Sequence, residues 1–181
     1  MCQEERIKVN DLFIAHPCIS NKDIILAKLS KSAMKRVSHF PPMIGVEKVA
    51  FLIYQLSTIA IFVTMLFLEF RINQTLPFHA GMTVYIMGLV LLIISTINFS
   101  KPSDNGINQN GLYQLSRNPM YVAYFISLAG ISLLVQSLTL LRFVFLFQIS
   151  AHWIILSEER WCIEQFGEEY RFYMNKVRRY I

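Results

Sequence analysis

Charged residues are scarce in this sequence, at 16% of the chain against 54% hydrophobic residues. A soluble domain normally carries about 25% charged residues, so this balance excludes an ordinary water-soluble protein and indicates a lipid environment. A signal-peptide pattern is also missing, because residues 1–10 contain acidic residues and no apolar run follows them. We therefore expect the N-terminus to remain in the cytoplasm.

Cysteine is scarce as well. Cys2, Cys18 and Cys162 lie far apart, a spacing that supports neither a disulfide framework nor a zinc site, so we interpret them as free thiols and expect no metal. The net charge of +5 would suit a nucleic-acid partner, but the basic residues cluster beside apolar segments. Anionic lipid headgroups and membrane topology explain such clusters more simply, so we expect a membrane partner and no nucleic acid.

Long apolar segments are what the chain does contain. The first has 22 residues with Glu69 as its single charge, enough to cross a core of roughly 30 Å at about 1.5 Å per residue. Pro77 and Gly81 are predicted to mark the turn that follows. The third, with 15 residues, would span about 22 Å, so it crosses thin membrane, tilts little or is re-entrant. Two helical hairpins are predicted, from four segments: residues 49–70, 82–99, 121–135 and 138–156.

Lysine and arginine residues predict the orientation of these hairpins. Eight lie in residues 6–48 and five in residues 160–179, whereas the loop of the first hairpin carries only Arg71. Basic residues are enriched on the cytoplasmic side of membrane proteins. Both termini and the loop at residues 100–118 are therefore expected to face the cytoplasm.

Amphipathic segments flank the apolar ones. Ser20 and Asp23 fit a capping box for a lysine-rich interfacial helix near the N-terminus. Near the C-terminus an apolar stripe recurs at helical spacing, with a break expected at Gly167; it consists of Cys162, Phe166, Tyr170, Tyr173 and Val177. The predicted fold is an all-α, polytopic membrane helical bundle with about four transmembrane helices and interfacial amphipathic helices at both ends.

Polar residues meet at the cytoplasmic ends of the second hairpin. Asn118 is suited to cap the third apolar helix and Pro119 to begin it, so a helix N-terminus that attracts carboxylates emerges beside Arg117. The fourth helix runs into Glu158 and Glu159 at the same level. A plain helix cap, a snorkelling arginine and a helix end entering water are the simpler interpretation. Together, however, the groups would form a pocket with anion-binding groups on one wall and carboxylates on the other, which suits a zwitterionic amino acid linked to a ribose.

Four motifs follow one another in this region. They are Gly111-Leu112-Tyr113, Arg117-Asn118-Pro119-Met120-Tyr121, Glu158-Glu159 and Phe166-Gly167-Glu168-Glu169-Tyr170-Arg171-Phe172-Tyr173. Their order and spacing resemble the isoprenylcysteine carboxyl methyltransferase family and its phospholipid N-methyltransferase relatives, over residues 104–179. The resemblance implies a cytoplasmic site for S-adenosylmethionine, closed by the C-terminal helix and open sideways to lipid for a hydrophobic acceptor.

Site residues follow from the resemblance, position by position. Asn118 replaces the more common histidine and Ala123 a glycine, changes small enough for the cofactor site to survive. Ile154 stands where the eukaryotic prenylcysteine enzymes carry an arginine suited to the substrate carboxylate, so we do not transfer that substrate. The implied cofactor-binding residues are Asn105, Ile107, Asn108, Tyr113, Arg117, Asn118, Pro119, Met120, Tyr121, Glu158 and Glu159.

The expected reaction is methyl transfer from S-adenosylmethionine to a lipid or lipid-soluble acceptor. Such an in-line displacement requires that the protein align the reactants and exclude water, and it needs no metal. An amine or hydroxyl acceptor would also need a base. His152 is the candidate base, although a packing histidine bonded to Ser157, Tyr124 or another neighbour is the simpler interpretation. Two alternatives stay open: an NADPH-dependent reductase of the sterol-reductase type, and a non-catalytic scaffold or small transporter.

The chain is thus expected to have three parts. Residues 1–46 form a cytoplasmic segment with an amphipathic helix, residues 47–100 the first transmembrane hairpin, and residues 101–181 the cofactor-binding region.

Overall fold

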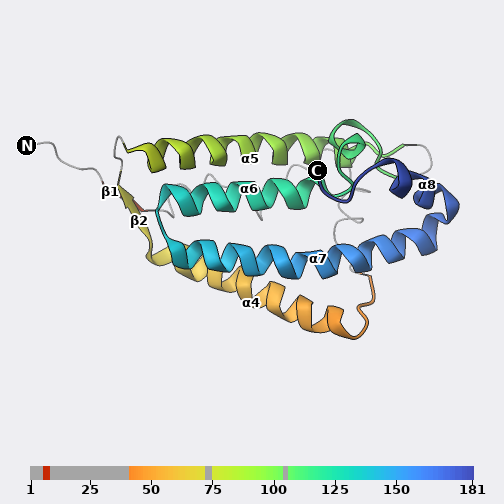
Figure 1. The fold of residues 1–181 in the computed structure, drawn as a ribbon, viewed down its shortest axis with the longest axis horizontal. Coiled ribbons are helices and arrows are strands. Elements are labelled where there is room, and N and C mark those ends of the chain that lie inside the picture. The colour runs from red at the N-terminus through yellow and green to blue at the C-terminus, as the bar shows by residue number, and fades with distance from the viewer. Residues whose placement is uncertain (1–5, 9–40, 72–74, 104–105) are drawn as a thin grey trace, which may run out of the picture.

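The structure is a computed structural model that describes residues 6–8, 41–71, 75–103 and 106–181. Within these residues, four long helices lie side by side, and a short fifth helix folds back at one end (Figure 1). The predicted amphipathic helix near Ser20, and also Cys2, Cys18 and Asn105, lie outside the described residues. The helices are α4 (Val46–Phe67), α5 (Leu76–Ser100), α6 (Pro119–Leu134), α7 (Leu138–Phe166) and α8 (Glu168–Lys176), with a 3-10 turn, η1 (Gly111–Gln114), before α6.

Three of the described helices, α4, α5 and α7, are long and apolar enough to cross a membrane. Their outer faces carry exposed aliphatic residues such as Leu56 on α4 and Val90 on α5, as expected where lipid is the solvent. Serine and threonine hydroxyls within the bundle donate to carbonyl oxygens one turn back, as Thr96 does to Leu92. The predicted all-α membrane bundle is confirmed.

Glycines allow α5 and α6 to pack closely. A Cβ atom on Gly88 would lie 2.5 Å from the amide nitrogen of Ser127, and one on Gly130 would lie 2.4 Å from that of Tyr85. Small residues at such crossings let two membrane helices approach. The prediction that Gly81 and Pro77 mark a turn is wrong, because Pro77 lies in the first turn of α5, where its missing N–H costs nothing, and Gly81 faces α6.

The second hairpin extends further than predicted. The 16 residues of α6 span about 24 Å, whereas the 29 residues of α7 span about 43 Å and continue past the predicted end at residue 156. The C-terminal apolar stripe is therefore divided between the end of α7 and α8. The break at Gly167 is confirmed, with φ +56° at that residue.

Two strands of three residues were not predicted. Strand β1 (Arg6–Lys8) pairs antiparallel with β2 (Glu69–Arg71), which follows α4 at the end of the bundle opposite α8 (Figure 1). Both termini were predicted to face the cytoplasm; within the bundle, residues 6–8 lie at the end opposite α8. Counting basic residues cannot reveal a backbone pairing between segments so far apart in the chain. The orientation across a membrane stays a prediction.

Candidate functional site

A cavity of about 280 Å³ lies where the ends of α5, α6 and α7 approach α8. This volume is close to the lower limit for small-molecule sites, which are typically about 300–1,000 Å³. Two sets of residues line it. Polar and aromatic groups come from the loop before η1, the start of α6, the end of α7 and α8, and mostly aromatic and apolar groups come from the middle of the bundle.

Most residues of the predicted cofactor site line this one cavity. Asn105 lies outside the described residues, and Pro119 is buried in the first turn of α6 without reaching the cavity. The lining residues that the resemblance implied are Ile107, Asn108, Tyr113, Arg117, Asn118, Met120, Tyr121, Glu158 and Glu159.

The two adjacent glutamates have different surroundings. Glu158 accepts a hydrogen bond from the hydroxyl of Tyr121 at 2.8 Å, which joins α7 to the first turn of α6. Glu159 is 3% exposed and lies between two guanidinium groups, with Arg117 Nε at 3.0 Å from Oε1 and Arg179 Nη2 at 2.8 Å from Oε2. Successive residues on a helix point in different directions, so the two carboxylates take different partners.

Arg117 is more fully engaged than predicted. Besides Glu159, its Nη1 atom donates to the carbonyl oxygens of Met174 at 2.8 Å and Val177 at 3.1 Å. We expected the arginine and the carboxylates to face each other across a pocket, but Arg117 and Glu159 are in direct contact. The sequence could not reveal these contacts, because Val177 in the C-terminal segment lies 60 residues further along the chain than Arg117.

Asn118 also has a different role at the start of α6. It is the N-cap residue, as predicted, but its side chain makes no capping hydrogen bond. Instead its Nδ2 atom donates to the carbonyl oxygen of Arg179 at 3.2 Å. This contact ties the start of α6 to the end of the chain.

The loop before η1 contributes one buried acceptor. Asn108 Oδ1 is buried without a hydrogen-bond partner among the described residues, while Gly106 adopts φ +84° in the same loop. A buried polar atom left unpaired costs free energy, so such an atom in a cavity wall is suited to a ligand that carries a donor.

Helix α8 covers the cavity with aromatic residues. Tyr170 and Tyr173 are buried and pack with Ile107 and Val177. Burial raises the pKa of both phenols above its ordinary value of 10, so both hydroxyls stay protonated at neutral pH. The Tyr173 hydroxyl donates to the carbonyl oxygen of Tyr113 at 2.6 Å, which joins α8 to η1.

His152 does not line the cavity. Its Nδ1 atom lies 2.7 Å from the hydroxyl of Tyr180, which fits a packing histidine bonded to a neighbour other than Ser157 and Tyr124. The structure therefore does not bring the predicted base together with the rest of the site.

Sequence reasoning did not assign several lining residues to the site. Tyr54, Phe99 and Tyr124 lie inside apolar segments, where no local signal separates them from lipid-facing residues. Trp161, Tyr170 and Tyr173 also line the cavity. So do Pro41, Gly106, Ile154, Cys162 and Phe166.

These features define a helical membrane protein with a polar and aromatic cavity at one end of the bundle. A model of the phospholipid methyltransferase family matches residues 96–169, from the end of α5 to the start of α8. The match confirms the resemblance found in the motifs and indicates a membrane methyltransferase of lipid-related substrates. Neither a curated protein nor a solved structure matches the chain.

Proposed function

We propose that the chain transfers a methyl group from S-adenosylmethionine to a lipid or lipid-soluble acceptor within this cavity. The observation that carries the proposal is the gathering of separate motifs, from the loop before η1, from α6 and from α7, around one cavity that contains the Tyr121–Glu158 pair. These motifs come from the stretch that matches the phospholipid methyltransferase family.

The chemistry of the lining suits this cofactor. Bound S-adenosylmethionine supplies an electrophilic methyl group beside a positively charged sulfur. Glu158 would accept hydrogen bonds from the hydroxyl or ammonium groups of the cofactor. Asn108 Oδ1 offers a buried acceptor for another donor. The aromatic side chains of Tyr170 and Tyr173 would exclude water from the reacting groups.

The acceptor would occupy the part of the cavity nearest the middle of the bundle. Tyr54, Tyr124 and Ile154 line it there, and Ile154 is 1% exposed. Arg117 is the cation among the described lining residues, and it pairs with Glu159. An acceptor with an apolar body and no carboxylate next to the reacting atom fits this lining better than a prenylcysteine does.

Direct binding of S-adenosylmethionine to the detergent-purified protein tests the proposal. We expect Glu158→Ala to weaken binding at least tenfold, about 1.4 kcal/mol, without unfolding the protein. Glu164→Ala is the matched control, because Glu164 is exposed on the same helix. Unchanged binding in Glu158→Ala, or no binding to folded wild type, would contradict the proposal.

A parallel titration with NADPH distinguishes the reductase alternative. Binding of NADPH in place of S-adenosylmethionine would favour a reductase, and binding of neither would favour a non-catalytic scaffold. Methylation of extracted lipids, followed by mass spectrometry, would then identify the acceptor.

A further inference from the structure

Residues 177–181 lie against the start of α6 and against α7. We call them the C-terminal strap. A parallel β-bridge joins Ser116 to Arg178, and the amide of Arg117 donates to the carbonyl oxygen of Arg178 at 2.9 Å. The family match ends at residue 169, so the strap lies beyond it.

The strap contacts three parts of the cavity wall without lining the cavity itself. It holds the start of α6 because the carbonyl oxygen of Arg179 accepts hydrogen bonds from Ser116 Oγ at 3.3 Å and from Asn118 Nδ2 at 3.2 Å. It holds the wall formed by α8 and the loop before η1 because Val177 packs with Ile107 and Tyr173.

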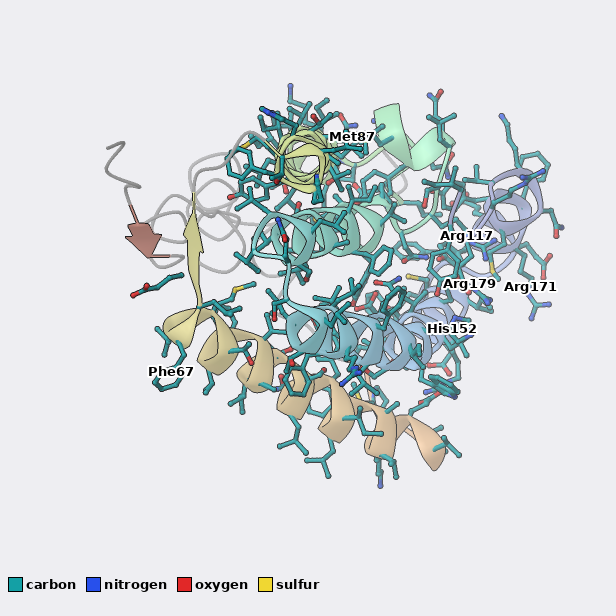
Figure 2. All side chains as sticks on the ribbon, turned by 60° about the vertical axis from the view of Figure 1, so that its left-hand side comes forward. Phe67, Met87, Arg117, His152, Arg171 and Arg179 are labelled. Atoms are coloured by element: carbon teal, nitrogen blue, oxygen red, sulfur yellow. The ribbon has the colours of Figure 1, made fainter. Side chains whose placement is uncertain are left out.

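The third contact reaches α7. The Arg179 guanidinium donates to Glu159 Oε2 from Nε at 3.0 Å and from Nη2 at 2.8 Å, directly beside Glu158 in the chain. Tyr180 binds His152, two turns earlier on α7. Figure 2 shows Arg117 and Arg179 near each other and His152 further along α7, whereas Arg171 projects outward from α8.

We propose that the C-terminal strap holds the cofactor site in its binding geometry, with Arg179 and Tyr180 as positioning residues. The Arg179 guanidinium binds the carboxylate of Glu159, which is buried and already paired with Arg117. This contact fixes the position of α7 relative to α6, and that position sets the distance between Glu158 and Tyr121. The inference rests on the proposed function, since it assigns the strap to the same site.

Cys162 gives a readout that does not depend on the cofactor. It lines the cavity, is a free thiol, and packs against the cluster that contains Val177. Release of the strap should therefore open a path to this thiol. With Cys2→Ser and Cys18→Ser as background, labelling by a bulky maleimide reports on Cys162 alone.

The experiment compares Arg179→Gln with Arg171→Gln in the full chain. Arg171 carries the same charge but is 60% exposed, so its substitution is a matched control. We expect Arg179→Gln to weaken S-adenosylmethionine binding about tenfold or more and to speed Cys162 labelling severalfold, with Arg171→Gln within about twofold of wild type in both. Arg179→Lys should recover part of the loss, because lysine keeps the charge but not the two-pronged contact.

Wild-type values for both readouts in Arg179→Gln would overturn the proposal. If that variant does not fold, Tyr180→Phe tests the strap through the contact with His152, with severalfold faster labelling expected and unchanged labelling against the proposal. If wild type itself binds no S-adenosylmethionine, the proposed function fails, and Cys162 labelling still decides whether the strap holds the cavity walls together.

Discussion

The hydroxyl of Tyr121 donates a hydrogen bond to Oε1 of Glu158 at 2.8 Å, across 37 positions of sequence. The bond fixes the carboxylate against the first turn of α6 and within the cavity wall. The first turn of α6 and the C-terminal part of α7 are thus held together beside the cavity. Both residues lie within the stretch that matches the family.

Tyr121→Phe removes this bond and leaves the ring in place. We expect cofactor affinity to fall roughly tenfold, because Glu158 loses its fixed orientation, while the free energy of unfolding falls by only about 1 kcal/mol. Calorimetric titration with S-adenosylmethionine and thermal unfolding in the same detergent measure the two quantities. A large loss of stability with unchanged affinity would mean that the bond serves the fold alone.

Substitution by glutamine should mainly lower stability at Glu159 and mainly lower cofactor affinity at Glu158. Glu159→Gln leaves two arginines without their buried counter-charge and should lower the free energy of unfolding by about 3–5 kcal/mol. Glu158→Gln should lower cofactor affinity with little effect on stability. Chemical denaturation of both variants checks this contrast, with the exposed Glu164→Gln as control. Equal free energies of unfolding for the two variants would refute it.

Gly88→Ala should weaken the α5–α6 contact, because its Cβ would overlap the backbone of Ser127. Overpacking of this kind costs about 1–3 kcal/mol. Val90→Ile, which adds one carbon on an exposed face of the same helix, should have little effect. Thermal unfolding of both variants tests the pair, and equal melting temperatures would show that α5 and α6 can separate without cost.

Alkaline pH should destabilise the protein through α8. The pKa values of Tyr170 and Tyr173 are raised by burial, so the folded state holds protons that the unfolded state releases. The stabilisation is complete below the unfolded pKa of about 10 and is lost as the pH rises above it. Unfolding measured at pH 8 and at pH values above 10 should show this loss, and the double variant Tyr170→Phe/Tyr173→Phe should reduce it; an identical pH dependence would contradict the assignment.

The positions of the helices follow largely from the sequence alone. Apolar runs of membrane-spanning length predict α4, α5 and α7 because lipid requires every backbone group to be paired within a segment. Asn118 and Pro119 mark the start of α6, and Gly167 marks the break between α7 and α8, because each of these positions follows local backbone rules. The hairpin then brings Glu159 close to Arg117, as expected.

Which groups are paired with one another and which face the cavity depends on the tertiary structure. Arg117 and Arg179 share Glu159 because the strap returns to α6 across 61 residues of chain, as the contact of Asn118 with the Arg179 carbonyl shows. Tyr54 and Tyr124 line the cavity because of how their helices are rotated about their axes in the bundle. Apolar sequence does not specify that rotation, since lipid and a protein interior are equally apolar solvents for such side chains; the close contacts between helices set it.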